Sequence, residues 1–459
     1  MAERSTDDNG DEDTDGGRPY DAAALVGIAG NTTLDRRERL EAAQALAWTD
    51  GHLDIGAAFL TGMAKDTTGR LRKRLKWARR WLPMWLWDKV WPWKLGQDIE
   101  WVRVDAAKAL AGLAGHREVG ASLLVFLADD TVLDGYTRVR AARALTELEG
   151  HREVGTGLLT RFAGDSRIEG ADRVRAAFCL AEADGCQDLG ADLLTRFADD
   201  TTLEDSDRTA AVSNLARLAG HRDAAATLLT RFARDPALAG YHRLFMVRVL
   251  VPLDGYRDAG VALLTGIADD TTVDGTIRLD AAKDLAGANP YLRGYVDEYR
   301  DDAIALLTRL VDDAVLEGFV RRRAASTLAA MDGQRDAAAA LLTRLAMDTT
   351  TVGRDRAEAA ECLAELEGYQ GAGVTLLTRF TEDTEFGGTH RVSAARSLTR
   401  VQDHEEAGAT LLISLARNTA LGGFDRMNAA RTLAGMDGYE RIGSKLLREL
   451  QYVSNGYGS

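Results

Sequence analysis

The chain has 459 residues, of which 46% are apolar and 28% charged, and its formal net charge is −14. This composition is typical of a soluble folded protein, and the negative charge disfavours nucleic acid as the main partner. Three cysteines do not make a disulfide framework, which favours a reducing cytoplasm.

The first 20 residues form a tail that is rich in acidic residues and glycine and poor in apolar side chains. We expect this tail to be disordered, because it has too little apolar surface to bury. Its composition is the reverse of a secretory leader, so we expect a cytoplasmic protein. No apolar run in the chain reaches the roughly 20 residues that a membrane-spanning helix needs.

A five-residue motif, Leu-Leu-Thr-Arg-Phe or a close variant, recurs along the chain at a nearly constant spacing. The copies are 35 residues apart except for one step of 43, and two degenerate copies begin at Ala24 and Phe59. Repetition at a period of this length indicates a solenoid. The regular copies begin at Leu123, Leu158, Leu193, Leu228, Leu263, Leu306, Leu341, Leu376, Leu411 and Leu446.

Each repeat contains two segments whose apolar residues recur at helical spacing, such as residues 151–165 and 172–183. This spacing predicts two amphipathic helices that form an antiparallel pair. One pair cannot bury both of its apolar faces, so the pairs must stack. We therefore predict an all-α fold, an α-solenoid or superhelix of about eleven helix pairs, which begins at residues 21–66 and continues through residues 102–459.

Residues 67–101 interrupt the repeat after its second copy. Within residues 70–94 lie six of the eight tryptophans of the chain and nine lysines or arginines. A basic helix with a Leu/Trp face is typical of a membrane-surface helix or of a helix that binds in a partner's groove. The segment could also pack against its own solenoid. The residues predicted to make these contacts are Arg74, Trp77, Arg80, Trp81, Trp85, Trp87 and Trp91.

Two positions barely vary among the repeats: an Asp or Asn seven residues after the motif starts, and an Arg eight residues further on. We interpret them as a structural ladder along the stack, in which each Asp accepts from backbone N–H groups at the start of the second helix and from Arg. Anion or metal sites are the alternative. The predicted ladder residues include Asp130, Asp165, Asp200, Asp235, Asp270, Arg138, Arg173, Arg208, Arg243 and Arg278.

Two neighbouring places in the second half of the chain break the pattern. Phe245 and Val249 replace small or polar residues of other repeats, and an extension near residues 289–299 adds Tyr291 and Tyr295. An apolar, aromatic patch of this kind is typical of a partner site. The alternative is a slightly larger core in a bent repeat.

Residue patterns for catalysis or for metal binding are absent from the repeats. Five of the seven histidines share one repeat position with tyrosines of other repeats, which indicates a packing position at a helix start. We predict no catalytic residues, no cofactor and no metal. The histidines are His52, His116, His151, His221 and His404, and the tyrosines are Tyr256, Tyr299, Tyr369 and Tyr439.

The stretches "VRVDAAKAL" at 102–110 and "VRRRAASTL" at 320–328, each after an Asp in the preceding turn, resemble the HEAT repeat in its short bacterial form. The resemblance implies that the first helix of each pair is outer and that the second lines a concave surface. It also implies a scaffold that binds a protein partner rather than an enzyme. A peripheral membrane scaffold is the first alternative, and a nucleic-acid-binding or base-repair HEAT protein is the second.

Overall fold

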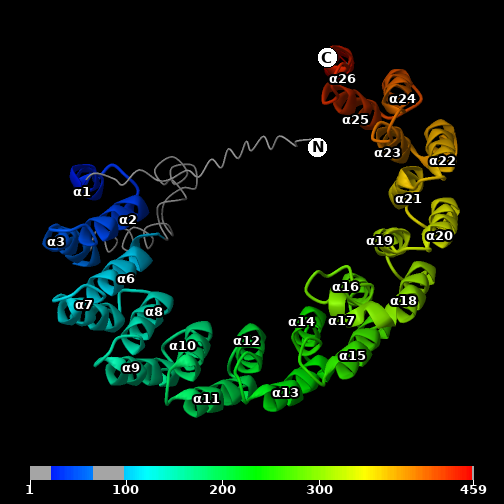
Figure 1. Ribbon diagram of the computed structural model, residues 1–459. Helices are drawn as coiled ribbons and strands as arrows, with labels where there is room; N and C mark the ends of the chain where they lie inside the picture. The colour runs from blue at the N-terminus through cyan, green and yellow to red at the C-terminus, as the bar shows by residue number, and fades with distance from the viewer. Residues whose placement is uncertain (1–21, 66–97, 457–459) are drawn as a thin grey trace, which may run out of the picture. The chain divides into compact units, whose positions relative to one another are not determined.

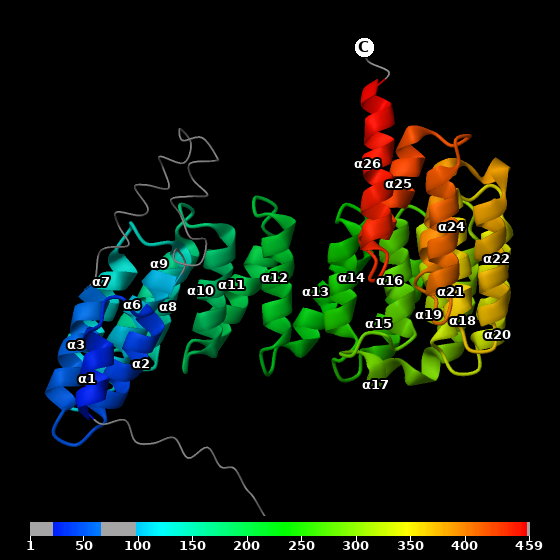
Figure 2. The same ribbon diagram turned by 90° about the horizontal axis from the view of Figure 1, so that it is seen from above.

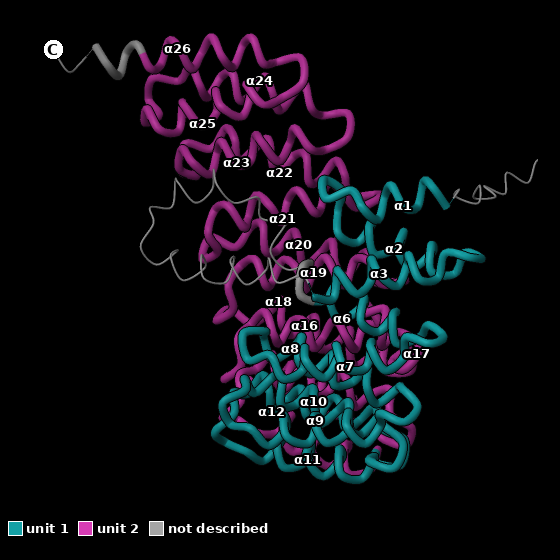
Figure 3. The backbone as a smooth tube through the Cα atoms, turned by 90° about the vertical axis from the view of Figure 1, so that its left-hand side faces the viewer, with its two compact units in different colours: residues 1–221 teal, residues 222–459 magenta. Residues whose placement is uncertain are grey.

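The computed structural model describes residues 22–65 and 98–456, and every regular element in these ranges is a helix. The chain divides into two compact units, Met1–His221 and Arg222–Ser459, which Figure 3 shows in separate colours. The 35-residue repeat continues through the division, where α12 ends at Ala216 and α13 begins at Arg222. Each unit is an α-solenoid of stacked helix pairs, as the repeat predicts.

Unit 1 consists of successive antiparallel pairs, and it curves so that the second helix of each pair lies on the inner side (Figure 1). Helices α9 and α10 match the two segments predicted from the sequence to within two residues at each end. The pairs are α1 (Ala22–Gly30) with α2 (Arg36–Ala47), α3 (Leu53–Lys65) with α6 (Asp98–Ala111), α7 (Arg117–Asp129) with α8 (Gly135–Thr146), α9 (Arg152–Gly164) with α10 (Gly170–Glu182), and α11 (Gln187–Asp199) with α12 (Asp205–Ala216).

Unit 2 repeats the same arrangement, and its second helices again form the inner side (Figure 1). Short helical turns, α17 (Arg293–Val296), η1 (Asp297–Tyr299) and η2 (Thr384–Phe386), lie between its longer helices. These are α13 (Arg222–Arg234) with α14 (Gly240–Leu250), α15 (Arg257–Asp269) with α16 (Gly275–Leu285), α18 (Arg300–Asp312) with α19 (Gly318–Ala329), α20 (Arg335–Met347) with α21 (Gly353–Glu365), α22 (Gln370–Glu382) with α23 (Gly388–Leu398), α24 (Glu405–Arg417) with α25 (Gly423–Ala434), and α26 (Glu440–Gly456).

The core is built from the same repeat positions in each pair. The second leucine of the motif is fully buried, as Leu159 and Leu264 show, and so are the paired alanines of the second helix, such as Ala141 and Ala142. Alanine at these positions lets helices of neighbouring pairs approach closely, while leucine fills the space between them. The inner helices add a large apolar residue of their own, such as Leu145 and Leu180, so every pair contributes to a continuous core.

Candidate functional site

The invariant arginines cap the first helix of their own pair. In each pair the arginine Nε donates to a carbonyl near the C-terminal end of the first helix, at 2.9 Å from Arg138 to Ala128 and 2.8 Å from Arg321 to Val311. The carbonyl lies ten residues earlier in the chain, except for Arg103, whose acceptor Ala64 lies 39 residues earlier. A positive charge at this end also interacts favourably with the helix dipole. The same bond is made by Arg39, Arg103, Arg173, Arg208, Arg243, Arg278, Arg356, Arg391 and Arg426.

The invariant Asp or Asn residues fold the turn that follows the first helix. Asp130 Oδ1 accepts from the backbone N–H of Val132 at 3.1 Å, and Asp270 Oδ1 accepts from that of Thr272 at 3.0 Å. The prediction that these aspartates accept from N–H groups at the start of the second helix is therefore wrong. Because the Asp immediately follows the first helix, its nearest free N–H is two residues on, and a different residue, Asp134, caps α8.

Arginine and aspartate also meet across neighbouring pairs. In unit 2 the distances from Arg Nη1 to Asp Oδ2 are 3.1 Å for Arg243 and Asp270 and 3.0 Å for Arg278 and Asp313. In unit 1 the Arg138 guanidinium lies 4.8 Å from the centre of the Phe162 ring in the next pair. These arginines thus join the end of one helix to the next pair.

Hydrogen bonds lower the pKa of two aspartates of this row, Asp165 and Asp200. The Arg167 side chain and backbone N–H lower the pKa of Asp165 to about 2. The hydroxyl and N–H of Thr202 lower the pKa of Asp200 in the same way.

Within residues 22–65 and 98–456, no group of three His, Cys, Asp or Glu side chains is arranged to hold a metal ion.

The shared His/Tyr position also joins neighbouring pairs. His151 stands just before α9, and its Nε2 lies 3.2 Å from Glu118 Oε1 in the preceding pair. In unit 2 the Tyr256 hydroxyl donates to Asp223 at 3.0 Å, and this bond raises the pKa of the tyrosine. Either ring reaches the carboxylate in the first turn of the preceding pair, which explains why the two residue types exchange here.

The residues that break the pattern in unit 2 lie in two places. Phe245 is 43% exposed on α14 and Val249 is half-buried one turn further on. Tyr295 belongs to α17, which Figure 2 shows along one edge of unit 2, and its ring centre lies 5.9 Å from the Arg257 guanidinium at the start of α15. Tyr291 is 86% exposed. Phe245 and Val249 thus belong to the inner helix α14, and Tyr291 and Tyr295 to the extension, so a single patch formed by all four stays a prediction.

A buried network fixes the start of this extension. Asp284, near the end of α16, is 2% exposed and accepts from Arg248 of α14 and, at 3.1 Å, from Asn289 Nδ2. Burial raises the pKa of the Asp284 carboxyl, while the Arg248 guanidinium opposes that shift. These hydrogen bonds tie the start of the extension to α16 and, through Arg248, to α14 of the preceding pair.

The tryptophan-rich segment falls outside the part of the chain that the structure describes. This applies to its predicted contact residues Arg74, Trp77, Arg80, Trp81, Trp85, Trp87 and Trp91. Among the helices that are described, none is both long enough and apolar enough to cross a membrane.

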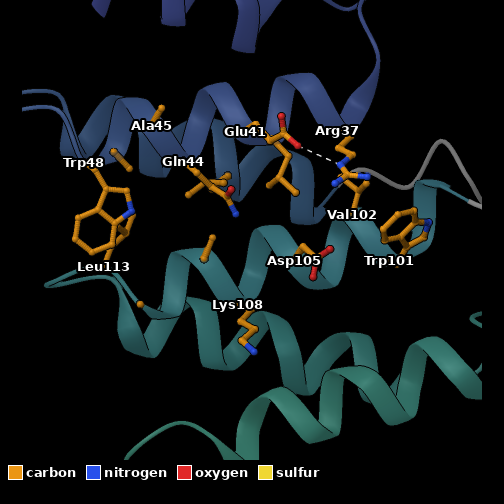
Figure 4. A pocket seen from close by; sticks show the side chains of 15 residues that line it. Arg37, Glu41, Gln44, Ala45, Trp48, Trp101, Val102, Asp105, Lys108 and Leu113 are labelled. Carbon is orange, nitrogen blue, oxygen red and sulfur yellow. Dashed lines mark hydrogen bonds and ion pairs between the residues drawn. The ribbon is translucent and has the colours of Figure 1, made fainter. Parts of the chain in front are cut away.

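Sequence reasoning missed a groove along the inner face of unit 1. Its first part is a cavity of about 870 Å³ between α2 and α6, with small residues such as Ala45, Ala109 and Gly112 in its lining. Figure 4 shows two tryptophans at opposite ends of this cavity, Trp48 beside Leu113 and Trp101 near Arg37. Trp48 is 76% exposed, so a large aromatic surface is available at the inner face.

The second part of the groove is a cavity of about 690 Å³ that spans α6, α8, α10 and α12. Asp105 and Lys108 line both cavities, so the two parts adjoin at α6. We call the whole feature the inner groove. Its second part is lined by Val104, Asp105, Lys108, Tyr136, Val139, Arg140, Arg143, Ala144, Glu147, Ala171, Val174, Arg175, Phe178, Cys179, Glu182, Ala210, Asn214 and Arg217.

Charged side chains cross-link the walls of the inner groove. Arg140 Nη2 lies 2.7 Å from Asp105 Oδ1, and Arg143 Nη2 lies 3.1 Å from Glu182 Oε2. Burial raises the pKa of the Cys179 thiol to about 11, so this cysteine stays protonated and unreactive at neutral pH. The groove thus offers fixed charges and aromatic surface to a bound molecule.

These features define the chain as a helical repeat protein with an open groove on the inner helices of unit 1. No protein-family model matches the chain, and no curated protein matches it with significance.

Proposed function

We propose that the protein is a non-catalytic scaffold that binds a protein partner in the inner groove of unit 1. The observation that carries this proposal is that two adjoining cavities follow the inner helices α2, α6, α8, α10 and α12. Neighbouring helices pack about 8–10 Å apart, so five inner helices offer a trough on the order of 40 Å long. An extended peptide at roughly 3.3 Å per residue would fill it with about 12 residues.

The resemblance to HEAT repeats supports the same function. The HEAT-like stretch "VRVDAAKAL" at 102–110 forms most of α6, and its Asp105 and Lys108 line both cavities. In a stack of pairs each repeat adds one inner helix to a shared surface. A long surface with exposed aromatic and arginine side chains has the composition of a protein interface.

A bulky side chain in the groove should abolish binding without unfolding the protein. Ala171 is exposed and lines the groove on α10, so tryptophan fits there without entering the core. We expect Ala171→Trp to weaken binding at least tenfold when the purified chain is titrated with a partner captured by the wild type. Ser122→Trp, at an exposed position on α7 outside the groove, is the matched control and should bind as the wild type does. Equal affinity of both variants would refute the proposed site.

The composition of residues 70–94 favours membrane association as a second candidate function. A segment with six tryptophans and nine basic residues would bind an anionic surface through both its charge and its aromatic side chains. The test is cosedimentation with anionic vesicles, for which the wild type should pellet and a Trp77/Trp81/Trp85→Ala variant should not. If neither the wild type nor the variant sediments with the vesicles, membrane association is ruled out as a function of this segment.

A further inference from the structure

Three arginines of the inner groove lie over aromatic rings, and each ring comes from the inner helix of the preceding pair. Arg140 and Arg175 belong to the inner helices α8 and α10, and Arg217 directly follows α12. The distances from guanidinium carbon to ring centre are 5.6 Å for Arg140 on Trp101, 4.5 Å for Arg175 on Tyr136, and 4.7 Å for Arg217 on Phe178.

A guanidinium that is held over an aromatic ring by a cation–π contact can still donate from its N–H groups. This arrangement is suited to bidentate recognition of a carboxylate or a phosphate, because less side-chain freedom is lost on binding. Arg140 is also held by Asp105, and Arg175 by Asp172 at 2.6 Å. Arg217 is exposed, and among the described residues no carboxylate lies within 4.0 Å of it.

The charges that line the second part of the inner groove do not match the charge of the whole protein. Five basic side chains and three acidic ones line it, whereas the chain carries a net charge of −14. An acidic protein that concentrates arginine in its main groove has a local potential opposite to that of its surface. The basic residues are Lys108, Arg140, Arg143, Arg175 and Arg217, and the acidic ones are Asp105, Glu147 and Glu182.

We infer that the inner groove of unit 1 binds an acidic segment of the partner protein, in which glutamate or aspartate side chains pair with the edges of Arg175 and Arg217. This inference rests on the proposed scaffold function and adds the chemistry of the bound segment. Apolar residues of the same segment would contact Tyr136, which is 46% exposed, and Trp48. The segment therefore carries separated carboxylates with apolar residues between them.

A nucleic acid is the competing occupant, because phosphates also pair with stacked arginines. Asp105, Glu147 and Glu182 stand between the arginines and would repel a phosphate at every step of a continuous backbone. A peptide can place neutral residues opposite these three carboxylates. The charge pattern of the groove therefore favours an acidic peptide.

The test is a fluorescence-anisotropy titration of the full chain with a labelled 12-residue peptide that alternates glutamate with leucine and tyrosine. We expect binding that weakens as salt is raised, and an affinity at least tenfold lower for an Arg175→Gln/Arg217→Gln variant. Arg196→Gln/Arg231→Gln is the matched control, since it removes the same charge from exposed or half-exposed positions of the outer helices α11 and α13. It should bind within twofold of the wild type.

Two further arms separate this inference from the proposed function. A peptide with lysine in place of glutamate should not bind, and single-stranded DNA of 12 nucleotides should bind more weakly than the acidic peptide. Tighter binding of the DNA, or equal loss in both double variants, would overturn the inference. If a captured partner loses affinity with Ala171→Trp but not with Arg175→Gln/Arg217→Gln, the scaffold function stands and the acidic segment is wrong.

Discussion

Replacing Arg321 by alanine should lower the free energy of unfolding of unit 2 by about 2–3 kcal/mol. Arg321 is 8% exposed and donates to Val311 O at 2.8 Å, to Asp348 Oδ2 at 3.1 Å and to Thr351 Oγ1 at 3.2 Å. Alanine would leave the Val311 carbonyl, the Asp348 carboxylate and the Thr351 hydroxyl without this donor at a largely buried contact between two pairs. The last carbonyls of α18 would also lose the positive charge that opposes their dipole.

The matched control for this prediction is Arg335→Ala. Arg335 pairs with Glu367 at 2.9 Å, but their side chains are 52% and 83% exposed. A surface ion pair of this kind contributes about 0–1 kcal/mol. Guanidinium denaturation followed by circular dichroism, with hydrogen exchange to locate the change in α18–α20, measures both variants. A loss for Arg321→Ala no larger than that for Arg335→Ala would contradict the capping role of the arginine row.

The second large effect concerns two glycines of one helix, which should respond to alanine with opposite signs. A Cβ at Gly155 of α9 would stand 2.6 Å from the backbone nitrogen of Thr146 and 2.9 Å from the carbonyl of Ala142. Backbone atoms cannot move aside as a flexible side chain does, so α9 must shift from the preceding pair. We expect Gly155→Ala to cost about 1–3 kcal/mol through overpacking, although alanine gains roughly 1 kcal/mol of helix propensity.

Gly157, two residues later, supplies the control. A Cβ there would meet no atom within 4 Å, so Gly157→Ala should stabilise unit 1 by about 0.5–1 kcal/mol. The midpoint of thermal unfolding and the exchange rates of α8–α10 amides give the sign for each variant. Stabilisation by both substitutions would show that the spacing of the pairs is not set by the glycine. In unit 2 Ala225 and Ala338 occupy the same repeat position, fully buried.

The helix pairs could be predicted because the residues that build the core recur at fixed positions. Leu159 and its equivalents are buried in the same way in each pair, so the same apolar residue recurs at the same repeat position along the sequence. The arginine row was visible for the same reason. The main hydrogen-bond partner of these arginines could not be predicted. Ala128 and Val311 accept through their backbone carbonyls, and every residue has a backbone carbonyl whatever its side chain.

The inner groove could not be predicted because its lining varies from repeat to repeat. Arg140 and Arg175 share a repeat position, but Asp105 occupies it in the preceding pair and Ala210 in the following one. Trp48 and Trp101 come from different positions of their helices and meet in one cavity only through the packing of α2 on α6. Without a periodic signal, only the fold reveals that these residues face the same space.

Site-specific photo-crosslinking tests the scaffold proposal most directly. A diazirine amino acid whose side chain is about the size of leucine replaces either Ala171 in the inner groove or Ser122 on α7, and the chain is irradiated with a bound partner. We predict a covalent adduct from position 171, with partner residues identified by mass spectrometry, and none from position 122. A partner that remains bound but crosslinks from position 122 and not from position 171 would contradict the assignment of the inner groove as the binding site.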